Sequence, residues 1–446
     1  MKVQEYGRVK ACSARRALSW GGLAVLILSS SAGMVRAQTG GAPTTGPVPR
    51  TERIEDRTAS EPDAYKPLGI KVGSFLLFPT LEADEMLNDN IFATSTGRTA
   101  SFVQLLKPTI DVRSQWSVHQ LDFFATGGFG FYTADSSLNF QDFSVGAKGR
   151  VDIQRDWNVY GGGSFTRGHE ELGTPNTASG STFQPSIYNQ IAANAGYYQA
   201  FQRLSVRLDG RMDNFTYFNN SQGPAQGFVP NSDRNRTEFR ETARIGYEFA
   251  PSFQVWTRGG LNQRSYATVP DAFGLNRNSN GWEILGGVTI DLGGITSLEA
   301  FGGYLQQNYV SGQFSNVSVP TFGLTGYWNP MRTLWVKPFV RRTVDDSSFS
   351  NAASYLNTAF GLDVTYDLRA NVSVEGHGDY SIADYTAVTA GNTQYDQYYN
   401  FRLGLMYKPT RNFFVGPQYQ FQHRTSNQVG SDYDQNIVML RLGAQL

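Results

Sequence analysis

Long hydrophobic runs are missing from this sequence, since no stretch approaches the roughly 18 uninterrupted apolar residues of a membrane-spanning helix. A helical membrane protein is therefore excluded. Cysteine is nearly missing as well, with Cys12 the only one in 446 residues. This excludes a disulfide scaffold and sites built from several thiolates. Charged residues make up only 17% and balance to a formal net charge of zero, so nucleic acid is not expected as a partner.

The first 37 residues have the layout of a secretory signal peptide. Five basic residues in the first 16 positions precede the apolar stretch Ala17–Ile27, and Val35-Arg36-Ala37 fits a small-x-Ala cleavage site. Serines 29–31 interrupt the stretch too early for a membrane anchor. Cleavage after Ala37 would remove six Lys/Arg, one Glu and the cysteine, leaving 32 basic and 37 acidic residues and a net charge of about −5.

Two regions follow the predicted cleavage site. Residues 38–66 are rich in Gly, Pro, Thr and charge and have almost no large apolar side chains, so we interpret them as a disordered periplasmic segment. Residues 67–446 are rich in Gly, Tyr and Phe, while the mean hydropathy of the whole chain is only −0.36. A membrane β-barrel can have such a polar average, because only every second residue of its strands meets lipid.

Strict alternation of apolar and polar residues is the main structural signal. Within Arg203–Asp213, the residues Leu204, Val206, Leu208, Gly210 and Met212 alternate with Arg, Ser and Asp. Because successive side chains of a strand point to opposite faces, such a segment is apolar on one side and ionic on the other. Similar alternation occurs in 282–292, 356–366 and 438–446.

Turn signals divide residues 67–446 into segments joined alternately by very short turns and longer polar loops. The short turns fall near 116, 155, 201, 251, 293, 330, 369 and 410, and the longer loops near 88–100, 133–139, 170–182, 219–235, 267–279, 310–316, 346–353, 386–393 and 426–432. Tight periplasmic turns and longer outer loops are typical of outer-membrane barrels. The pattern predicts an all-β protein: a transmembrane antiparallel up-and-down barrel of about 18 strands, or 16 if a turn is misplaced.

Aromatic residues near both ends of the segments fit the two interfacial girdles of such a barrel, for example Trp116, Trp157 and Trp335 at the short turns. A soluble propeller or sandwich would also give regular strands and turns. Its strands would be shorter, however, and repeated charges would not occupy one face. The membrane barrel is therefore the favoured interpretation.

Two segments carry a family resemblance. Phe75–Phe92 is an apolar strand with Pro79 followed by an acidic stretch ending in Asn-Asp-Asn-Ile-Phe, and Leu105–Arg113 contains its own Pro-Thr-Ile. This order resembles the putative β-barrel porin, type 2, family, and the likeness extends over roughly 68–446. The resemblance implies an outer-membrane barrel of a Gram-negative bacterium, often accompanying exopolysaccharide systems. One departure is the terminal Leu446, where many outer-membrane barrels have Phe.

Charged residues on the inward face are the candidate site. They are predicted to line the lumen and to screen solutes by charge and hydrogen bonding, or simply to pair across strands in a wet interior. These positions are Arg203, Arg207, Asp209, Arg211, Asp213, Arg240, Arg244, Arg258, Lys337, Arg341, Asp363, Glu375, His377, Asp379 and Arg402. Arg264, Glu238, Glu248, Glu283 and Glu299 follow the same pattern. The longest loop, 219–235, is our candidate for an inward-folded constriction.

Three other groups of polar residues can be interpreted either as ordinary solvated side chains or as sites with a chemical role. Glu375, His377 and Asp379 share one face of one strand, which favours a hydrated ladder over a metal or proton site, because a site needs ligands from several strands. The acidic group Glu82, Asp84, Glu85, Asn88 and Asp89 is interpreted as a solvated outer loop rather than a calcium or lipopolysaccharide site. His423 near Ser426 and Asp432 could form a rim hydrolase, but no nucleophile elbow accompanies them.

Together these features predict a non-enzymatic outer-membrane channel for passive passage of hydrophilic solutes, without a cofactor or metal. The alternative is an accessory barrel of exopolysaccharide export or cell-surface assembly, acting as a scaffold. The expected partners are outer-membrane lipid and lipopolysaccharide, the barrel-assembly machinery and, for the alternative, polysaccharide-export components.

Overall fold

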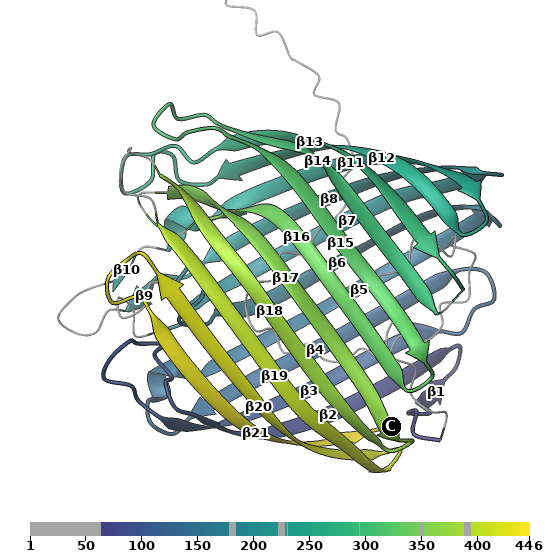
Figure 1. Ribbon diagram of the computed structural model, residues 1–446, viewed down its shortest axis with the longest axis horizontal. Coiled ribbons are helices and arrows are strands. Elements are labelled where there is room, and N and C mark those ends of the chain that lie inside the picture. Colours follow the sequence, from purple (N-terminus) through teal and green to yellow (C-terminus); the bar gives the residue numbers. More distant parts are fainter. Residues whose placement is uncertain are drawn as a thin grey trace, which may run out of the picture.

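The computed structural model describes residues 64–446, apart from 178–183, 222–227, 230, 294, 348, 350–351 and 388–393. The predicted signal peptide and nearly all of the predicted segment 38–66 lie outside these residues. Within the described residues, 18 antiparallel strands form one closed barrel (Figure 1). The predicted fold class and strand count are thus confirmed.

Each strand is long enough to cross a bilayer when tilted. The barrel strands are β2 (Phe75–Asn88), β3 (Ser101–Ser114), β4 (Gln120–Tyr132), β5 (Phe140–Gln154), β6 (Trp157–Glu170), β7 (Ser186–Phe201), β8 (Leu204–Tyr217), β11 (Arg236–Ala250), β12 (Phe253–Tyr266), β13 (Ser279–Asp291), β14 (Thr296–Tyr309), β15 (Val317–Met331), β16 (Leu334–Asp346), β17 (Ala352–Arg369), β18 (Val372–Ala387), β19 (Tyr395–Thr410), β20 (Phe413–Ser426) and β21 (Tyr433–Gln445).

Consecutive strands are neighbours throughout, and the barrel closes where the last strand meets the first. β21 pairs with β2 from Thr80↔Gln445 to Asn88↔Ile437. The short strand β1 (Ile70–Val72) pairs with the first residues of β2, which β21 does not reach. Closure removes the exposed edges that an open sheet would present.

The connections differ between the two ends of the barrel, as the sequence predicts. Six of the eight connections at one end are two-residue turns, and the C-terminus and β1 lie at this short-turn end (Figure 1). The other, long-loop end carries longer connections, including the small hairpin of β9 (Asn220–Ser221) and β10 (Phe228–Val229) and two 3-10 helices, η2 (Ser136–Leu138) and η3 (Ser232–Arg234). No helix among the described residues is long and apolar enough to cross a membrane.

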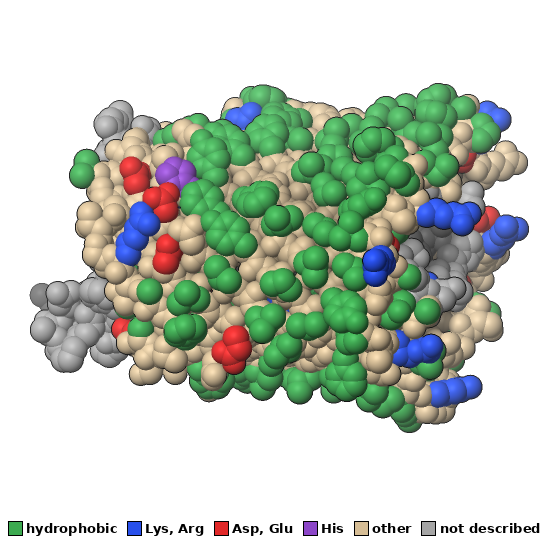
Figure 2. Space-filling view, turned by 60° about the horizontal axis from the view of Figure 1, so that its bottom comes forward, with side chains coloured by type: hydrophobic (Ala, Val, Ile, Leu, Met, Phe, Trp, Pro, Cys, Tyr) green, Lys and Arg blue, Asp and Glu red, His purple; other side chains and the backbone are tan. Residues whose placement is uncertain are grey.

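The outer surface of the barrel is apolar. Figure 2 shows hydrophobic side chains over the middle of one outer face and most of the charged ones at its two ends. On β13, Ile284 and Val288 are 60% and 41% exposed, whereas Thr289 and Asp291 on the same strand are 0% and 1% exposed. Because exposed and covered residues alternate along the strands, the apolar set faces outward and the polar set faces the interior.

A charge placed on this apolar surface should be far more costly than one placed inside. Leu362 lies near the middle of β17 and is 41% exposed, so Leu362→Arg is expected to lower the free energy of unfolding by about 2–4 kcal/mol. Ser164→Arg is the control, because Ser164 lies on the inner face between the small residues Gly146 and Ala192. Urea unfolding in lipid vesicles would measure both, and equal losses would contradict the assignment of the two faces.

Candidate functional site

Ion pairs line the inner face of the barrel. Some lie along one strand, some join adjacent strands, and two join strands that are three apart in the barrel. They include Arg207–Asp209 (2.8 Å), Arg211–Asp213 (2.5 Å), Arg240–Glu238 (3.1 Å), Arg244–Glu299 (3.0 Å), Arg258–Glu283 (3.1 Å), Lys107–Glu82 (2.5 Å), Arg441–Glu82 (3.0 Å) and Arg441–Glu375 (3.6 Å). The interior is nevertheless open in places, because the inward side chain of Lys148, which is 4.0 Å from Asp122, is 69% exposed.

Arg203 is the exception among the candidate lumen residues. It lies in the two-residue turn between β7 and β8 and is exposed, because β8 begins at Leu204. Position 203 continues the alternation that places Arg207 and Arg211 on the inner face, but it lies before the first residue of the strand. Arg203 is therefore not part of the inner wall. Lys337, Arg341 and Arg402 lie within strands β16 and β19, and Lys337 is registered opposite Asp363.

His377 is the central residue of the Glu375, His377 and Asp379 group, for which a metal or proton site was the alternative to a hydrated ladder of side chains. Its Nδ1 is 2.7 Å from Asp363 and its Nε2 is 2.8 Å from Asp379. Both ring nitrogens therefore already contact carboxylates, and Glu375 points instead to Arg441. No group of three potential metal ligands occurs in the described part of the chain.

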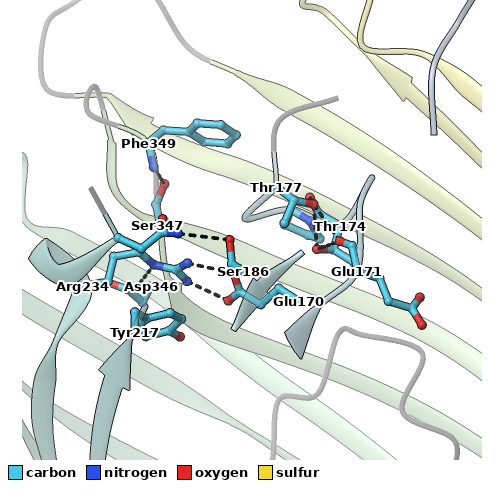
Figure 3. A network of polar contacts seen from close by, with 12 residues as sticks. Glu170, Glu171, Thr174, Thr177, Ser186, Tyr217, Arg234, Asp346, Ser347 and Phe349 are labelled. Atoms are coloured by element: carbon cyan, nitrogen blue, oxygen red, sulfur yellow. Dashed lines mark hydrogen bonds and ion pairs between the residues drawn. The ribbon is translucent and has the colours of Figure 1, made fainter. Parts of the chain in front are cut away.

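The strongest cluster lies at the long-loop end, where side chains from distant strands meet inside the barrel (Figure 3). Arg234, the last residue of η3, makes two hydrogen bonds of 2.7 Å to the carboxylate of Glu170 at the end of β6. Asp346, at the end of β16, accepts a hydrogen bond from the hydroxyl of Tyr266 and lies 3.2 Å from Arg236. Since β6, β11, β12 and β16 are not all neighbours, these contacts cross the interior.

The cluster is deeply buried and its charges are paired. Arg234, Arg236, Glu238 and Asp346 are each 5–7% exposed. Burial alone would lower the pKa of Arg234, but the carboxylates of Glu170 and Asp346 outweigh it and raise that pKa. Arg234 therefore stays charged, and its guanidinium also lies 4.0 Å from the ring centroid of Tyr217. Such a network resists separation, because breaking it leaves a buried charge without a partner.

Several long loops turn inward and reach the level of this buried cluster along the barrel. Gly173 and Pro175, in the connection after β6, accept hydrogen bonds from the hydroxyls of Tyr433 and Tyr385 on the far side of the barrel. Arg277, in the connection after β12, donates to the carbonyls of Ser347 (2.8 Å) and Phe349 (2.9 Å). These contacts form a constriction at the long-loop end, which we call the outer constriction and define by Arg234, Arg236, Asp346, Arg277 and the 171–177 segment.

The sequence identified only part of this constriction. The loop 219–235 was expected to fold inward, and its described end does so through Arg234; side chains of 221–230 lie outside the described residues. Glu170, Arg236 and Asp346 were not among the candidates, nor were the loops after β6 and β12. Glu170 and Asp346 fell within predicted loops and Arg236 directly followed one, whereas the structure places them at the ends of β6, β16 and β11. Predicted loops lack the period-two pattern from which an inward direction can be deduced, so no signal marked these residues.

The acidic group after Pro79 is not a solvated outer loop, so that interpretation is wrong. β2 continues to Asn88, which places Glu82 and Asp84 on the inner wall with side chains 13% and 0% exposed. Both carboxylates contact the Lys107 ammonium on β3 at 2.5 Å. Leu81, Ala83 and Leu87 alternate with them on the outer face, which is why β2 extends through the acidic stretch. Glu85 is the charged exception on that outer face, where it accepts a hydrogen bond from Gln104.

The rim histidine does not form a hydrolase constellation. His423 Nδ1 lies 2.5 Å from Asp434, whose carboxylate also contacts Arg98 at 2.8 Å. The backbone of Ser426 bonds to Asp432, while its hydroxyl accepts from the backbone of Gln428. Among the described residues, His423 makes no hydrogen bond to a serine hydroxyl, so a nucleophile–base pair is not assembled.

Fold and interior together define a porin-like β-barrel with a charged inner wall. A family model described as Putative beta-barrel porin 2 matches residues 61–446. The chain therefore belongs to this family, and the resemblance noted at the sequence level is confirmed.

Solved structures with a similar architecture come from Pseudomonas aeruginosa. OpdO is 17% identical, with a TM-score of 0.43, and the match covers 84% of this chain and 98% of that one. OpdK crystallised with vanillate is 12% identical, with a TM-score of 0.43 and coverage of 83% and 99%. No curated protein matches the sequence.

Proposed function

We propose that this protein is an outer-membrane channel of a Gram-negative bacterium for passive passage of small hydrophilic solutes. The observation that carries the proposal is the inner wall: it is ionic along its length, and Lys148 is 69% exposed inside the barrel. An apolar outside and a water-accessible charged inside are what a solute pathway across a bilayer requires.

The inner wall should discriminate weakly between anions and cations. Its ion pairs contain both signs in comparable number, so the field of one sign largely cancels that of the other. The outer constriction, rather than net charge, is then the barrier that solutes meet. No step of this function uses a catalytic residue or cofactor.

Planar-bilayer recording tests the proposal directly. Purified protein should give stepwise conductance, and in a tenfold salt gradient the reversal potential should stay close to zero. Swelling of vesicles in small neutral sugars should be faster with the protein than without it. A barrel that inserts but conducts neither ions nor sugars would contradict the channel.

The outer constriction favours a second candidate, the accessory barrel. Loops that pack across the long-loop end through buried residues such as Arg234 and Arg277 (both 5% exposed) would also suit a scaffold for surface assembly or polysaccharide export. A silent barrel in bilayers, together with co-purification of polysaccharide-export components from the membrane, is the outcome that would support this role instead.

A further inference from the structure

The wall of the barrel is interrupted between β15 and β16. Only five residue pairs keep these strands in register, fewer than at any other seam between barrel strands in the described part of the chain, and the ladder stops at Gly323↔Arg341. Beyond it, Val317–Phe322 pairs only with β14 and Arg342–Asp346 only with β17. Both stretches are fully described, so toward the long-loop end these two strand edges face each other unpaired.

The separation has a cause in the outer constriction. The Val344 carbonyl accepts a hydrogen bond of 2.8 Å from Arg264, and Asp346 is held by Tyr266 and Arg236. These partners lie on β11 and β12, several strands away around the barrel. The end of β16 is therefore held toward the interior and away from β15. Pro338 adds to the weakness, because it interrupts the ladder opposite Gly326 and has no backbone N–H to donate.

The gap begins within the apolar belt. Pro320 on β15 is registered with Tyr304, which is 42% exposed, and Tyr304 in turn with Ile284, which is 60% exposed. Unpaired backbone groups are strongly disfavoured in hydrocarbon unless water or another polar group satisfies them. A polar occupant of this seam would supply the missing partners.

Two consecutive arginines at the point where the ladder ends face opposite sides of the wall. Arg341 is registered with Ala359, which is 3% exposed, and so lies on the inner face. Arg342 lies on the outer face, with its guanidinium 5.7 Å from the ring centroid of Phe322. The Nε atoms of both arginines are buried and have no hydrogen-bond partner among the described residues.

Few groups compete for this pair of cations. The Asp384 carboxylate on β18 interacts electrostatically with Arg342. Thr321 donates a hydrogen bond of 2.9 Å to the carbonyl of Arg342 and so bridges the edges of the gap with its side chain. The Oγ1 of Thr343 is a third buried polar atom without a partner. Three successive residues, the last paired residue Arg341 and the first two unpaired ones, thus each have a buried polar side-chain atom without a partner, which points to a polar ligand.

We propose that the β15–β16 seam is a lateral portal that binds an anionic single-chain amphiphile and lets it pass between the barrel interior and the outer half of the bilayer. The anionic head would bind Arg342 and then Arg341, which lie on opposite sides of the wall. The apolar chain would lie along Phe322 and Pro320 on the outer face. This role is additional to passage of hydrophilic solutes, which does not require the wall to open.

Photolabelling tests the binding site. The protein, with Cys12→Ser, is placed in phosphatidylcholine vesicles with dodecanoic acid that carries a terminal diazirine. Adducts should concentrate on residues 317–322 and 342–346, and Arg341→Gln/Arg342→Gln should lower them at least about tenfold through loss of charge-assisted hydrogen bonds. Arg402→Gln, an inward arginine on another seam, is the matched control and should leave them unchanged.

A cysteine lock tests passage. Thr321→Cys/Thr343→Cys, oxidised, would fasten the two edges, whereas Thr325→Cys/Phe339→Cys fastens a pair that is already in register. The first lock should lower probe labelling of inward residues at least about fivefold and leave ion conductance intact, while the second changes neither. Labels spread evenly around the outer surface, unchanged labelling in the double glutamine variant, or preferential labelling by a diazirine phospholipid would each overturn the portal. Loss of conductance in the unmodified protein would instead contradict the channel.

Discussion

Replacing Lys107 with methionine is expected to lower the free energy of unfolding by about 3–5 kcal/mol, the usual cost of removing one partner from a buried ion pair. The Lys107 ammonium lies 2.5 Å from both Glu82 and Asp84, and the three side chains are only 10%, 13% and 0% exposed. Methionine has a similar length but no charge, so the Asp84 carboxylate would be left buried without its cation. Urea unfolding in lipid vesicles, followed by gel mobility of the folded form, measures the loss.

Two controls identify the cause of this loss. Lys148→Met removes an inward lysine whose side chain is 69% exposed, so its effect should stay below about 0.5 kcal/mol. Adding Asp84→Asn to Lys107→Met removes the stranded charge and should recover a large part of the stability. If the two lysine variants lost the same stability, or the double variant recovered none, the ion pair would not be what holds this position.

The location of Lys107 makes the effect important for assembly. Glu82 also accepts hydrogen bonds from Arg441 on the last strand, at 3.0 and 3.2 Å. One carboxylate thus joins β3, β2 and β21, at the seam where the chain's two ends meet. Because the β2–β21 pairing is the one that closes the ring, we expect the Lys107→Met protein to show slower barrel closure as well as lower stability.

Replacing Asp346 with alanine is expected to raise single-channel conductance at least about twofold and to shift selectivity toward anions, since charge and width at a constriction set both. Asp346 is 6% exposed, accepts the Tyr266 hydroxyl and lies 3.2 Å from Arg236. Without it, the positive charge of the cluster is no longer balanced and the end of β16 loses its anchor. The measurement is the conductance step and the reversal potential in planar bilayers.

Asp135→Ala is the matched control for this prediction. Asp135 caps η2 at the same end of the barrel, through a hydrogen bond from the backbone of Ser137, but has no contact with the outer constriction among the described residues. Conductance and selectivity should therefore stay as in the parent protein. Tyr266→Phe removes only one hydrogen bond to Asp346 and should give an intermediate increase. Equal behaviour of Asp346→Ala and the parent would show that the constriction does not limit permeation.

The sequence was sufficient where the physical rule is local. In β8, alternation alone placed Arg207, Asp209, Arg211 and Asp213 on one face, and the structure pairs them as two ion pairs along that strand. The prediction that Arg203 faces the lumen was wrong by one residue, because the period-two alternation specifies a face of the strand but not where the strand begins. The loop interpretation of Glu82 and Asp84 was also wrong. An acidic stretch beside Asn and Asp resembles a loop, because the sequence does not show that Lys107 on the neighbouring strand pairs with it.

The outer constriction could not be deduced from the sequence for a different reason. Arg234 and Glu170 are 64 positions apart, and Tyr266 and Asp346 are 80 apart. Whether such residues meet depends on the curvature of the closed barrel and on how far each loop bends inward. Neither quantity leaves a periodic mark in the sequence, and buried partners are chosen by geometry rather than by spacing.

The amino-acid sequence by itself determined the class of this protein. Its segments are apolar on one face and polar on the other, are long enough to cross a bilayer, and are joined by alternating short and long connections. Such segments can form hydrogen bonds to all their backbone groups within a membrane only as a closed antiparallel ring. The tertiary structure alone decided which loops cross the interior and where the ring is incomplete. The physical reason is that strand pairing follows from contacts between consecutive segments of the chain. The contacts of Asp346 with Arg236 and Tyr266 instead join strands far apart around the barrel, and the gap beside Arg342 depends on these contacts.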